Sequence, residues 1–278
     1  MRLLDTHQHL WDLRQFPYSW CAGIPALNRS FLPADYAAAA AGLDITKTVF
    51  MEGDVDEPHA LAEARHVQAL TDRHPLIAGI VASGRPEHDG FRVHLEQLAQ
   101  LPRVRGLRRV LHTQPDGLSR QPRFAANLRL LAEFGLTFDL CVLARQLPVG
   151  LALVRECPGV TFVLDHCGVP DVKARALDPW REHIRQLAAL PNVVCKISGL
   201  VVYADPATWS VDDLRPWVEH VLEQFGWDRV VWGGDWPVCT LAAPLARWVE
   251  AIRALTGSAS AEQQAKLFHR NAERIYRV

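Results

Sequence analysis

The stretch Leu3-Leu4-Asp5-Thr6-His7-Gln8-His9-Leu10-Trp11 opens the chain with a short apolar run that ends in two histidines. Successive side chains of a β-strand point to opposite faces, so His7 and His9 share one face with Asp5. The two imidazole rings therefore project from the same face at the end of one strand. This arrangement suits the binding of a metal ion, or the packing of two neutral rings around a reacting carbonyl group.

Composition limits the kind of partner that the chain can have. Of its 278 residues, 49% are hydrophobic, and 30 basic residues against 31 acidic ones give a net charge of −1. This balance offers no basic face to nucleic acid and favours a small-molecule substrate. No stretch approaches the roughly 20 apolar residues of a membrane span, and Met1-Arg2 leads into a strand instead of a signal sequence. We expect a cytoplasmic protein without nucleic-acid or membrane partners, with its oligomeric state, a homodimer included, left open.

Apolar runs of strand length alternate with segments of helical periodicity along the whole chain. The expected strands are 3–9, 48–53, 76–83, 104–112, 136–143, 160–166, 193–199 and 229–235. The expected helices are 33–44, 58–73, 87–100, 121–134, 145–157, 178–190, 211–225, 242–255 and 260–270. Parallel neighbours need crossover connections, so the alternation predicts a parallel sheet. Eight such units indicate a single-domain (β/α)8 TIM barrel over residues 1–278, and an open doubly wound sheet is the alternative.

The longest segment without periodicity, residues 12–30, follows the first strand and lies among aromatic residues. In a barrel, the loops after the strands form the catalytic face. The segment therefore predicts an aromatic wall or lid over the site. A hydrophobic flap that only closes the barrel mouth fits the same residues equally well.

Polar residues stand at the C-terminal ends of the expected strands, which converge on one mouth in a barrel. They are His7, His9, Glu52, Arg108, His112, His166, Lys196, Ser198 and Asp235. Burying such groups unpaired costs a few kcal/mol each, so packing alone does not explain them. Each of Glu52, His112 and Lys196, taken alone, could instead belong to a hydrogen-bonded polar layer that caps the barrel. The set of His7, His9, His166 and Asp235 instead indicates a functional site.

Three motifs resemble the amidohydrolase superfamily: Asp-Thr-His-Gln-His-Leu-Trp at 5–11, Leu-Asp-His-Cys-Gly at 164–168 and Trp-Gly-Gly-Asp-Trp-Pro at 232–237. More narrowly, the chain resembles the sugar-lactonase branch, of the L-fuconolactonase and L-rhamnonolactonase type, collinearly over essentially its whole length. The resemblance implies a (β/α)8 barrel with hydrolytic chemistry at its mouth. It also implies that His7, His9, His166 and Asp235 occupy the family's site positions.

The ligand set departs from the two-metal members of the superfamily. Those members place a bridging Lys or Glu on strand four and a further His on strand five, whereas this chain offers Arg108, His112, Asp139 and Cys141. A two-metal site is therefore not expected. One divalent metal ion, Zn²⁺, could be held by His7, His9 and Asp235 together with water. Related lactonases of this branch manage without a required metal, so we expect the metal to be optional.

The resemblance implies a lactonase, and the chemistry of a lactone fits these residues. An ester carbonyl is far more electrophilic than an amide, so one base, a few hydrogen-bond donors and water suffice. We expect opening of a sugar-acid lactone, such as L-fucono-, L-rhamnono- or galactonolactone, to the free acid. Asp235 would activate the water, and the oxyanion would be stabilised by a bound Zn²⁺ or by His7, His9, His166 and Arg108.

Further side chains are expected to bind the sugar. Glu52, His112 and Lys196 are candidates for its hydroxyl groups, and its apolar face could stack on Trp11, Trp20 or Trp236. On the fourth strand Arg108 should face the mouth and Arg109 the helix layer. Two alternatives stay open: a metal-dependent hydrolase or decarboxylase of the same superfamily acting on another small carboxylate or amide, and a ligand-binding barrel without catalysis.

Overall fold

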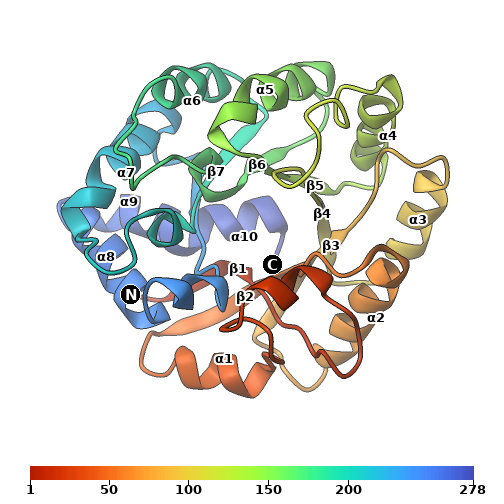
Figure 1. The fold of residues 1–278 in the computed structure, drawn as a ribbon, viewed down its shortest axis with the longest axis horizontal. Helices are drawn as coiled ribbons and strands as arrows, with labels where there is room; N and C mark the ends of the chain where they lie inside the picture. The colour runs from red at the N-terminus through yellow and green to blue at the C-terminus, as the bar shows by residue number, and fades with distance from the viewer.

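The computed structural model describes residues 1–278. Parallel strands form one eight-stranded sheet in the order β1 to β8, and Figure 1 shows the sheet as a barrel ringed by helices. The strands are β1 Leu3–Gln8, β2 Ile45–Met51, β3 Ile77–Ser83, β4 Val104–Val110, β5 Thr137–Cys141, β6 Phe162–Leu164, β7 Val193–Ile197 and β8 Val230–Trp232. Every expected strand is present. The predicted (β/α)8 TIM barrel is therefore confirmed.

The barrel closes where the chain beyond β8 meets β1. The backbone N–H of Asp235 donates to the carbonyl oxygen of His7, and that of His9 donates to Trp236, both at 2.8 Å. These hydrogen bonds continue the parallel pairing past the end of β8. They place the end of the Trp-Gly-Gly-Asp motif beside the His-Gln-His motif.

Two glycines allow this close approach of β8 to β1. A Cβ at Gly233 would lie 2.7 Å from the Cβ of His7, and one at Gly234 would lie 2.5 Å from Asp5 Oδ2. The Asp5 carboxylate lies in this space. It accepts hydrogen bonds from the backbone N–H groups of His7 and Gly234, at 2.9 and 2.7 Å, and from the Tyr36 hydroxyl at 2.8 Å. Any larger residue at either glycine would push β1 away from β8.

Helices surround the sheet, as the periodicity predicts. They are α1 Pro33–Ala39, α2 Ala60–Leu70, α3 Phe91–Leu98, α4 Pro122–Glu133, α5 Leu147–Glu156, α6 Trp180–Ala188, α7 Val211–Phe225 and α8 Leu245–Leu255. The chain ends in α9 Ala261–Ala265, a π-helical turn Lys266–Arg270 and α10 Asn271–Tyr276, so the expected helix 260–270 runs on to Tyr276. None of these helices has both the length and the apolar character needed to cross a membrane.

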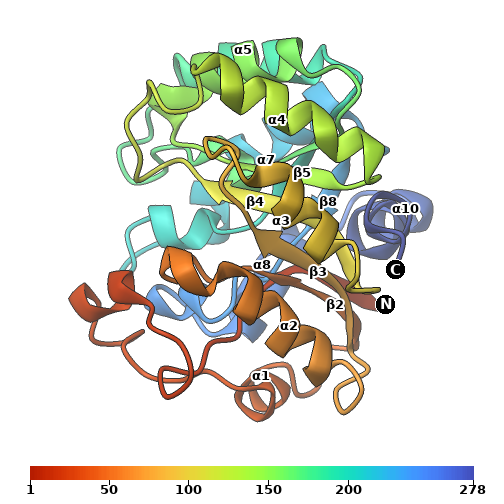
Figure 2. The same ribbon diagram turned by 90° about the vertical axis from the view of Figure 1, so that its right-hand side faces the viewer.

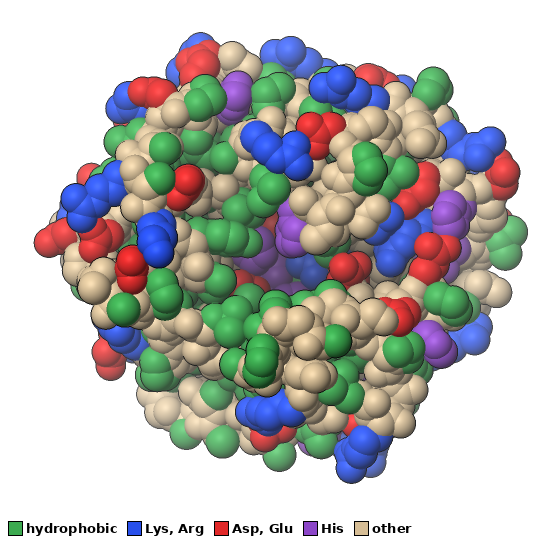
Figure 3. Space-filling view, viewed as in Figure 1, with side chains coloured by type: hydrophobic (Ala, Val, Ile, Leu, Met, Phe, Trp, Pro, Cys, Tyr) green, Lys and Arg blue, Asp and Glu red, His purple; other side chains and the backbone are tan.

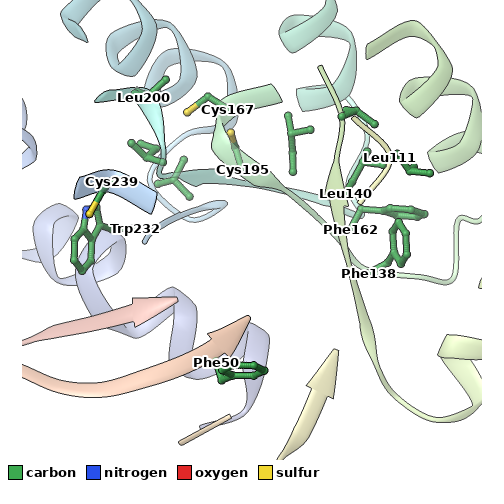
Figure 4. Close-up of a cluster of buried hydrophobic side chains, with 14 of the residues drawn as sticks. Phe50, Leu111, Phe138, Leu140, Phe162, Cys167, Cys195, Leu200, Trp232 and Cys239 are labelled. Atoms are coloured by element: carbon green, nitrogen blue, oxygen red, sulfur yellow. The ribbon is translucent and has the colours of Figure 1, made fainter. Parts of the chain in front are cut away.

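The apolar core has two parts. The larger part fills the space between sheet and helices, and Figure 4 shows Phe138, Phe162 and Trp232 within it. The smaller part fills the N-terminal end of the barrel with the side chains Leu4, Val49, Met51, Val81, Val163, Val194 and Val231. Helix α10 closes this floor with Ala272, Ile275 and Tyr276. Figure 2 shows α10 and both termini at one end of the barrel, opposite the dark red loop after β1.

The loop between β1 and α1 is a packed structure of aromatic residues. Trp11 is buried, pairs with Phe31 in an isolated bridge, and donates its indole N–H to the carbonyl oxygen of Arg29 at 2.7 Å. Trp20, in the 3₁₀ helix Ser19–Gly23, donates its indole N–H to the carbonyl oxygen of Gly53 at 2.8 Å. The loop is thereby fixed to the residues that follow β2.

Candidate active site

Four of the predicted side chains meet at the C-terminal end of the barrel, and we call them the mouth cluster: His7, His9, His166 and Asp235. His7 Nε2 lies 3.1 Å from His9 Nε2. Asp235 Oδ1 lies 3.6 Å from His7 Nε2 and 3.5 Å from His9 Nε2. The rings of His166 and His7 have centroids 4.5 Å apart. Figure 3 shows a central hollow on this face, with histidine side chains inside it.

The backbone at two members of the cluster is left-handed. His166 has φ 52° and Asp235 has φ 56°, values that are uncommon outside glycine and that concentrate at functional sites. Gly199, with φ 65°, makes room for both, because a Cβ there would lie 2.5 Å from His166 Nδ1 and 3.2 Å from Asp235 Oδ2. Ser198 Oγ lies 2.9 Å from His166 Nδ1 and fixes the ring.

A second, more deeply buried group lies behind the mouth cluster, and we call it the charge layer: Glu52, Arg108, Asp139, Asp165 and Lys196. Arg108 donates from Nε to Glu52 Oε1 and from Nη2 to the Glu52 carbonyl oxygen, both at 2.6 Å. Burial raises the pKa of the Glu52 carboxyl, but the Arg108 guanidinium outweighs it and holds that pKa below its usual value. This pair is therefore ionised.

Lys196 joins the rest of the charge layer to the mouth. Its Nζ lies 2.6 Å from Asp139 Oδ1, 2.9 Å from Asp165 Oδ1 and 3.4 Å from His7 Nδ1. Burial alone would lower the pKa of Lys196, but the carboxylates of Asp139 and Asp165 outweigh it and raise that pKa. Burial likewise opposes ionisation of Asp165, yet Lys196 holds its pKa well below the usual range. Lys196 is therefore an ammonium ion between two acidic side chains.

Burial acts on two of the histidines of the mouth cluster, and geometry places a proton on the third. Burial, with the charge of Lys196, lowers the pKa of His7 well below its usual value, and burial lowers the pKa of His166. His9 Nδ1 lies 2.9 Å from the carbonyl oxygen of Met51, which can only accept a hydrogen bond. His9 Nδ1 therefore carries a proton, and Nε2 faces His7 and Asp235.

The expected sugar contacts divide into two groups. Glu52 and Lys196 are fully buried and committed to ion pairs of the charge layer, so they support neighbouring residues and offer no free group to a sugar. Trp11 and Trp236 are 2% and 3% exposed, because each packs against Phe31, and their ring faces are not available for stacking. We therefore do not propose these four as direct contacts with the sugar.

His112 and Trp20 keep accessible surface, as a substrate contact requires. His112 follows β4, with Nδ1 3.1 Å from Cys141 Sγ, and burial together with the charge of Arg108 lowers its pKa to about 4.

The predicted orientations of the two arginines on β4 are confirmed. Arg108 points into the barrel, whereas Arg109 points outside it and donates to Glu87 Oε1 at 2.9 Å.

Sequence reasoning missed two members of the charge layer. Asp139 entered only as a departure from the family's strand-five histidine, and Asp165 only as a letter of the Leu-Asp-His-Cys-Gly motif. Both stand beside apolar strand residues, and that is the signal that could have identified them. A charge inside such a run needs a partner from another strand.

The mouth cluster can hold one metal ion. A tetrahedral Zn²⁺ ion with bonds of about 2.1 Å keeps its ligand atoms about 3.4 Å apart. The three separations among His7 Nε2, His9 Nε2 and Asp235 Oδ1, of 3.1, 3.5 and 3.6 Å, match that spacing. Ligand atoms of His7, His166 and Asp235 also lie within 4.8 Å of one another. The residues present therefore fit a single ion.

Comparison with known proteins identifies the family of the chain. The family model described as amidohydrolase matches residues 4–278. The L-fucono-1,5-lactonase of Burkholderia multivorans is 32% identical over 98% of this chain and 95% of its own length. The L-rhamnono-gamma-lactonase of Scheffersomyces stipitis is 24% identical over 63% of this chain and 59% of its own.

A solved structure is similar over its whole length. The crystal structure of an amidohydrolase from Burkholderia multivorans with bound zinc superposes with a TM-score of 0.89, at 29% identity, and covers all of both chains. The matched range 4–278 includes all three motifs that carry the resemblance and every member of the mouth cluster. On this evidence, the chain belongs to the amidohydrolase family.

Proposed function

We propose that this protein is a hydrolase that opens a sugar-acid lactone to the free acid, with residues 1–278 acting as one catalytic domain. The observation that carries the proposal is the position of Asp235, whose Oδ1 faces two imidazole nitrogens at 3.5 and 3.6 Å. At these distances neither ring holds Oδ1 in a short hydrogen bond, so this oxygen can contact a water molecule. The lactonase names of two relatives support the substrate class.

In the proposed reaction, Asp235 as carboxylate takes a proton from water while the water oxygen attacks the lactone carbonyl carbon. The lone pair on His9 Nε2 accepts a second hydrogen bond from the same water. The negative charge that develops on the carbonyl oxygen is stabilised by N–H groups of His7, His166 and Arg108. Protonated Asp235 then gives its proton to the ring oxygen as the C–O bond breaks, which releases the hydroxy acid.

This assignment changes the expected role of one histidine. His9 was expected to stabilise the oxyanion, but its Nδ1 proton is used on the Met51 carbonyl oxygen, so we assign Nε2 to accept a hydrogen bond from water instead. His9 is better suited to orient water. A Zn²⁺ ion held by His7, His9 and Asp235 would add Lewis-acid polarisation of the carbonyl.

The test is a panel of 1,4- and 1,5-lactones, including L-fucono-, L-rhamnono- and galactonolactone, assayed by acid release with and without chelator. We expect turnover of at least one sugar lactone and retention of activity in chelator. No turnover of any lactone would overturn the proposal. Complete loss in chelator, restored by metal, would instead favour the metal-dependent hydrolases and decarboxylases of the superfamily.

A further inference from the structure

A cavity of about 400 Å³ lies at the N-terminal end of the barrel, beside helix α10 and opposite the mouth cluster. Its walls are formed by α10 and by the segments that lead into β5, β6, β7 and β8. Tyr276 fixes α10 at this end, which Figure 2 shows, by donating from its hydroxyl to Asp139 Oδ1 at 2.7 Å. Small-molecule sites commonly have volumes of about 300–1,000 Å³. The cavity is therefore large enough for a small metabolite.

The charged side chains that line this cavity are all cationic. We call them the floor arginines: Arg229, Arg274 and Arg277. None of the three forms an ion pair with a carboxylate. The acidic side chains next to them in sequence pair with other cations: Asp228 with Lys266 at 2.7 Å, and Glu273 with Arg2 at 3.1 Å. The cavity therefore carries three positive charges that have no acidic partner in the protein.

Backbone carbonyl groups anchor the floor arginines and leave many of their N–H groups free. Arg229 donates three hydrogen bonds to carbonyl oxygens at the end of α6 and the start of β7. Arg274 donates one from Nη2 to the carbonyl oxygen of Asp228 at 2.7 Å. Arg277 donates one from Nη2 to the carbonyl oxygen of Gly135. A guanidinium group has five N–H donors, so Arg274 and Arg277 each keep four for a ligand.

The positive charges at this end of the barrel act against one another. Burial, together with the charges of Arg277 and Arg103, lowers the pKa of Arg105. Arg105 Nε donates to the carbonyl oxygen of Arg277 at 3.2 Å, which places this further cation next to the floor arginines. Burial also lowers the pKa of Arg229. Both shifts mean that the surroundings disfavour these cations, and a bound anion would reduce that cost.

Uncharged polar groups line the same cavity. Asn192 donates from Nδ2 to the carbonyl oxygens of Val160 and Cys157, at 3.0 and 3.3 Å, so its Oδ1 remains free to accept a hydrogen bond. Thr161 is exposed, and the hydroxyl of Thr137 is buried without a hydrogen-bond partner. Such groups suit the hydroxyls of a sugar.

We propose that this cavity binds an organic phosphate of the size of a sugar phosphate, with its phosphate group on the floor arginines. A phosphate monoester carries about two negative charges near neutral pH and has three acceptor oxygens, whereas a carboxylate has one charge and two oxygens. Arginine binds phosphate through two parallel hydrogen bonds. Binding at this end requires nothing of the chemistry at the mouth, so it stands or falls separately from the proposed function.

The test is isothermal titration calorimetry with glucose 6-phosphate at constant ionic strength, with inorganic phosphate, glucose and glucuronate as comparison ligands. We expect one glucose 6-phosphate per chain, bound more tightly than inorganic phosphate, and no binding of glucose. Arg274→Gln and Arg277→Gln should each weaken this binding at least about tenfold, because a hydrogen bond from a charged group is lost. Arg65→Gln is the matched control, since Arg65 is an exposed arginine of α2 without an ion pair. It changes the net charge equally and should leave the affinity unaltered.

Thermal unfolding supplies a second measurement. Bound glucose 6-phosphate should raise the Tm of the wild type and of Arg65→Gln, but not that of Arg274→Gln. If neither glucose 6-phosphate nor inorganic phosphate bound, or if both floor variants bound as tightly as the wild type, the proposal would be overturned. Tighter binding of glucuronate that also depends on Arg274 would show that the phosphate assignment is wrong. Should Arg277→Gln not fold, the exposed side chain of Arg274 still provides the same comparison.

Discussion

The mouth cluster and the charge layer are both polar and both buried, yet they differ in how closely their members approach. In the charge layer the ion pairs of Arg108 with Glu52 and of Lys196 with Asp139 measure 2.6 Å. Contacts among His7, His9 and Asp235 measure 3.1 to 3.6 Å. Short contacts satisfy buried charges within the protein. The longer distances in the mouth cluster leave an acceptor and donors without a close partner, so a bound ligand can form hydrogen bonds with them.

The comparison is tested most strongly at Asp235. Asp235→Asn keeps the size of the side chain but removes its ability to accept a proton, so we expect hydrolysis to fall by about two to four orders of magnitude. Because no short ion pair is lost, Tm should change little. Lactone turnover and Tm are measured on the same preparation. A folded variant with near wild-type turnover would eliminate Asp235 as the base.

We expect a substitution in the charge layer to lower the free energy of unfolding. Arg108→Ala leaves Glu52 buried without its cation, which costs about 3–5 kcal/mol, and it also removes an N–H group from the mouth. We therefore expect both a lower free energy of unfolding and lower turnover. The orientation of Arg108 toward the mouth predicts only the loss of turnover, and the loss of stability comes from its ion pair with Glu52. Denaturant unfolding and turnover per folded molecule measure the two effects.

Arg109→Ala is the matched control for that change. Arg109 pairs with Glu87 at 2.8 Å on the helix side of the same strand, and both side chains are 9% exposed. Its removal should lower stability while turnover per folded molecule stays at the wild-type level. Loss of turnover in Arg109→Ala alone would mean that the two faces of β4 have been assigned the wrong way round.

The sequence predicted the barrel well because apolar runs and helical periodicity are local signals. It placed the ends of β6 and β8 too far along the chain, since His166 and Asp235 adopt positive φ values that no strand accommodates. The mouth cluster could be predicted because its members stand at strand ends in recognisable motifs. The pairing of Asp139 with Lys196 depends on which side chains of β5 and β7 meet inside the barrel. Tyr276 gave no signal, because its hydrogen bond to Asp139 forms only when α10 crosses the floor.

Metal removal should have a smaller effect than either substitution. The charge layer has cations of its own in Arg108 and Lys196, and the mouth spacing fits a single ion. We expect at most one Zn²⁺ per chain after purification, removable by chelator with little change in Tm. Elemental analysis and thermal unfolding before and after chelation measure this. Two tightly held metal ions per chain would contradict the assignment.

Another buried carboxyl group, Glu63, completes the comparison because it forms no ion pair with a cation. Its Oε1 accepts hydrogen bonds from the Tyr18 hydroxyl at 2.8 Å and the Gly53 N–H at 3.2 Å, and its Oε2 has no partner. Burial, together with the charge of Glu52, raises the pKa of Glu63 to about 8. In contrast to the members of the charge layer, Glu63 is therefore protonated in the folded protein at neutral pH.

This difference predicts a small dependence of stability on pH. Unfolded Glu63 has a pKa near its ordinary value of 4.5, so between about pH 4.5 and 8 only the unfolded chain releases the proton. The stabilisation is fully present below that interval and is lost as pH rises through it. Glu63→Gln imitates the protonated acid, keeps the acceptor for Tyr18, and cannot titrate. Its Tm should therefore decline less between pH 5 and 8 than that of the wild type, as thermal unfolding across this range would show. Parallel Tm profiles for the two proteins would mean that Glu63 is already ionised in the folded state, and that a buried carboxylate here needs no cation of its own.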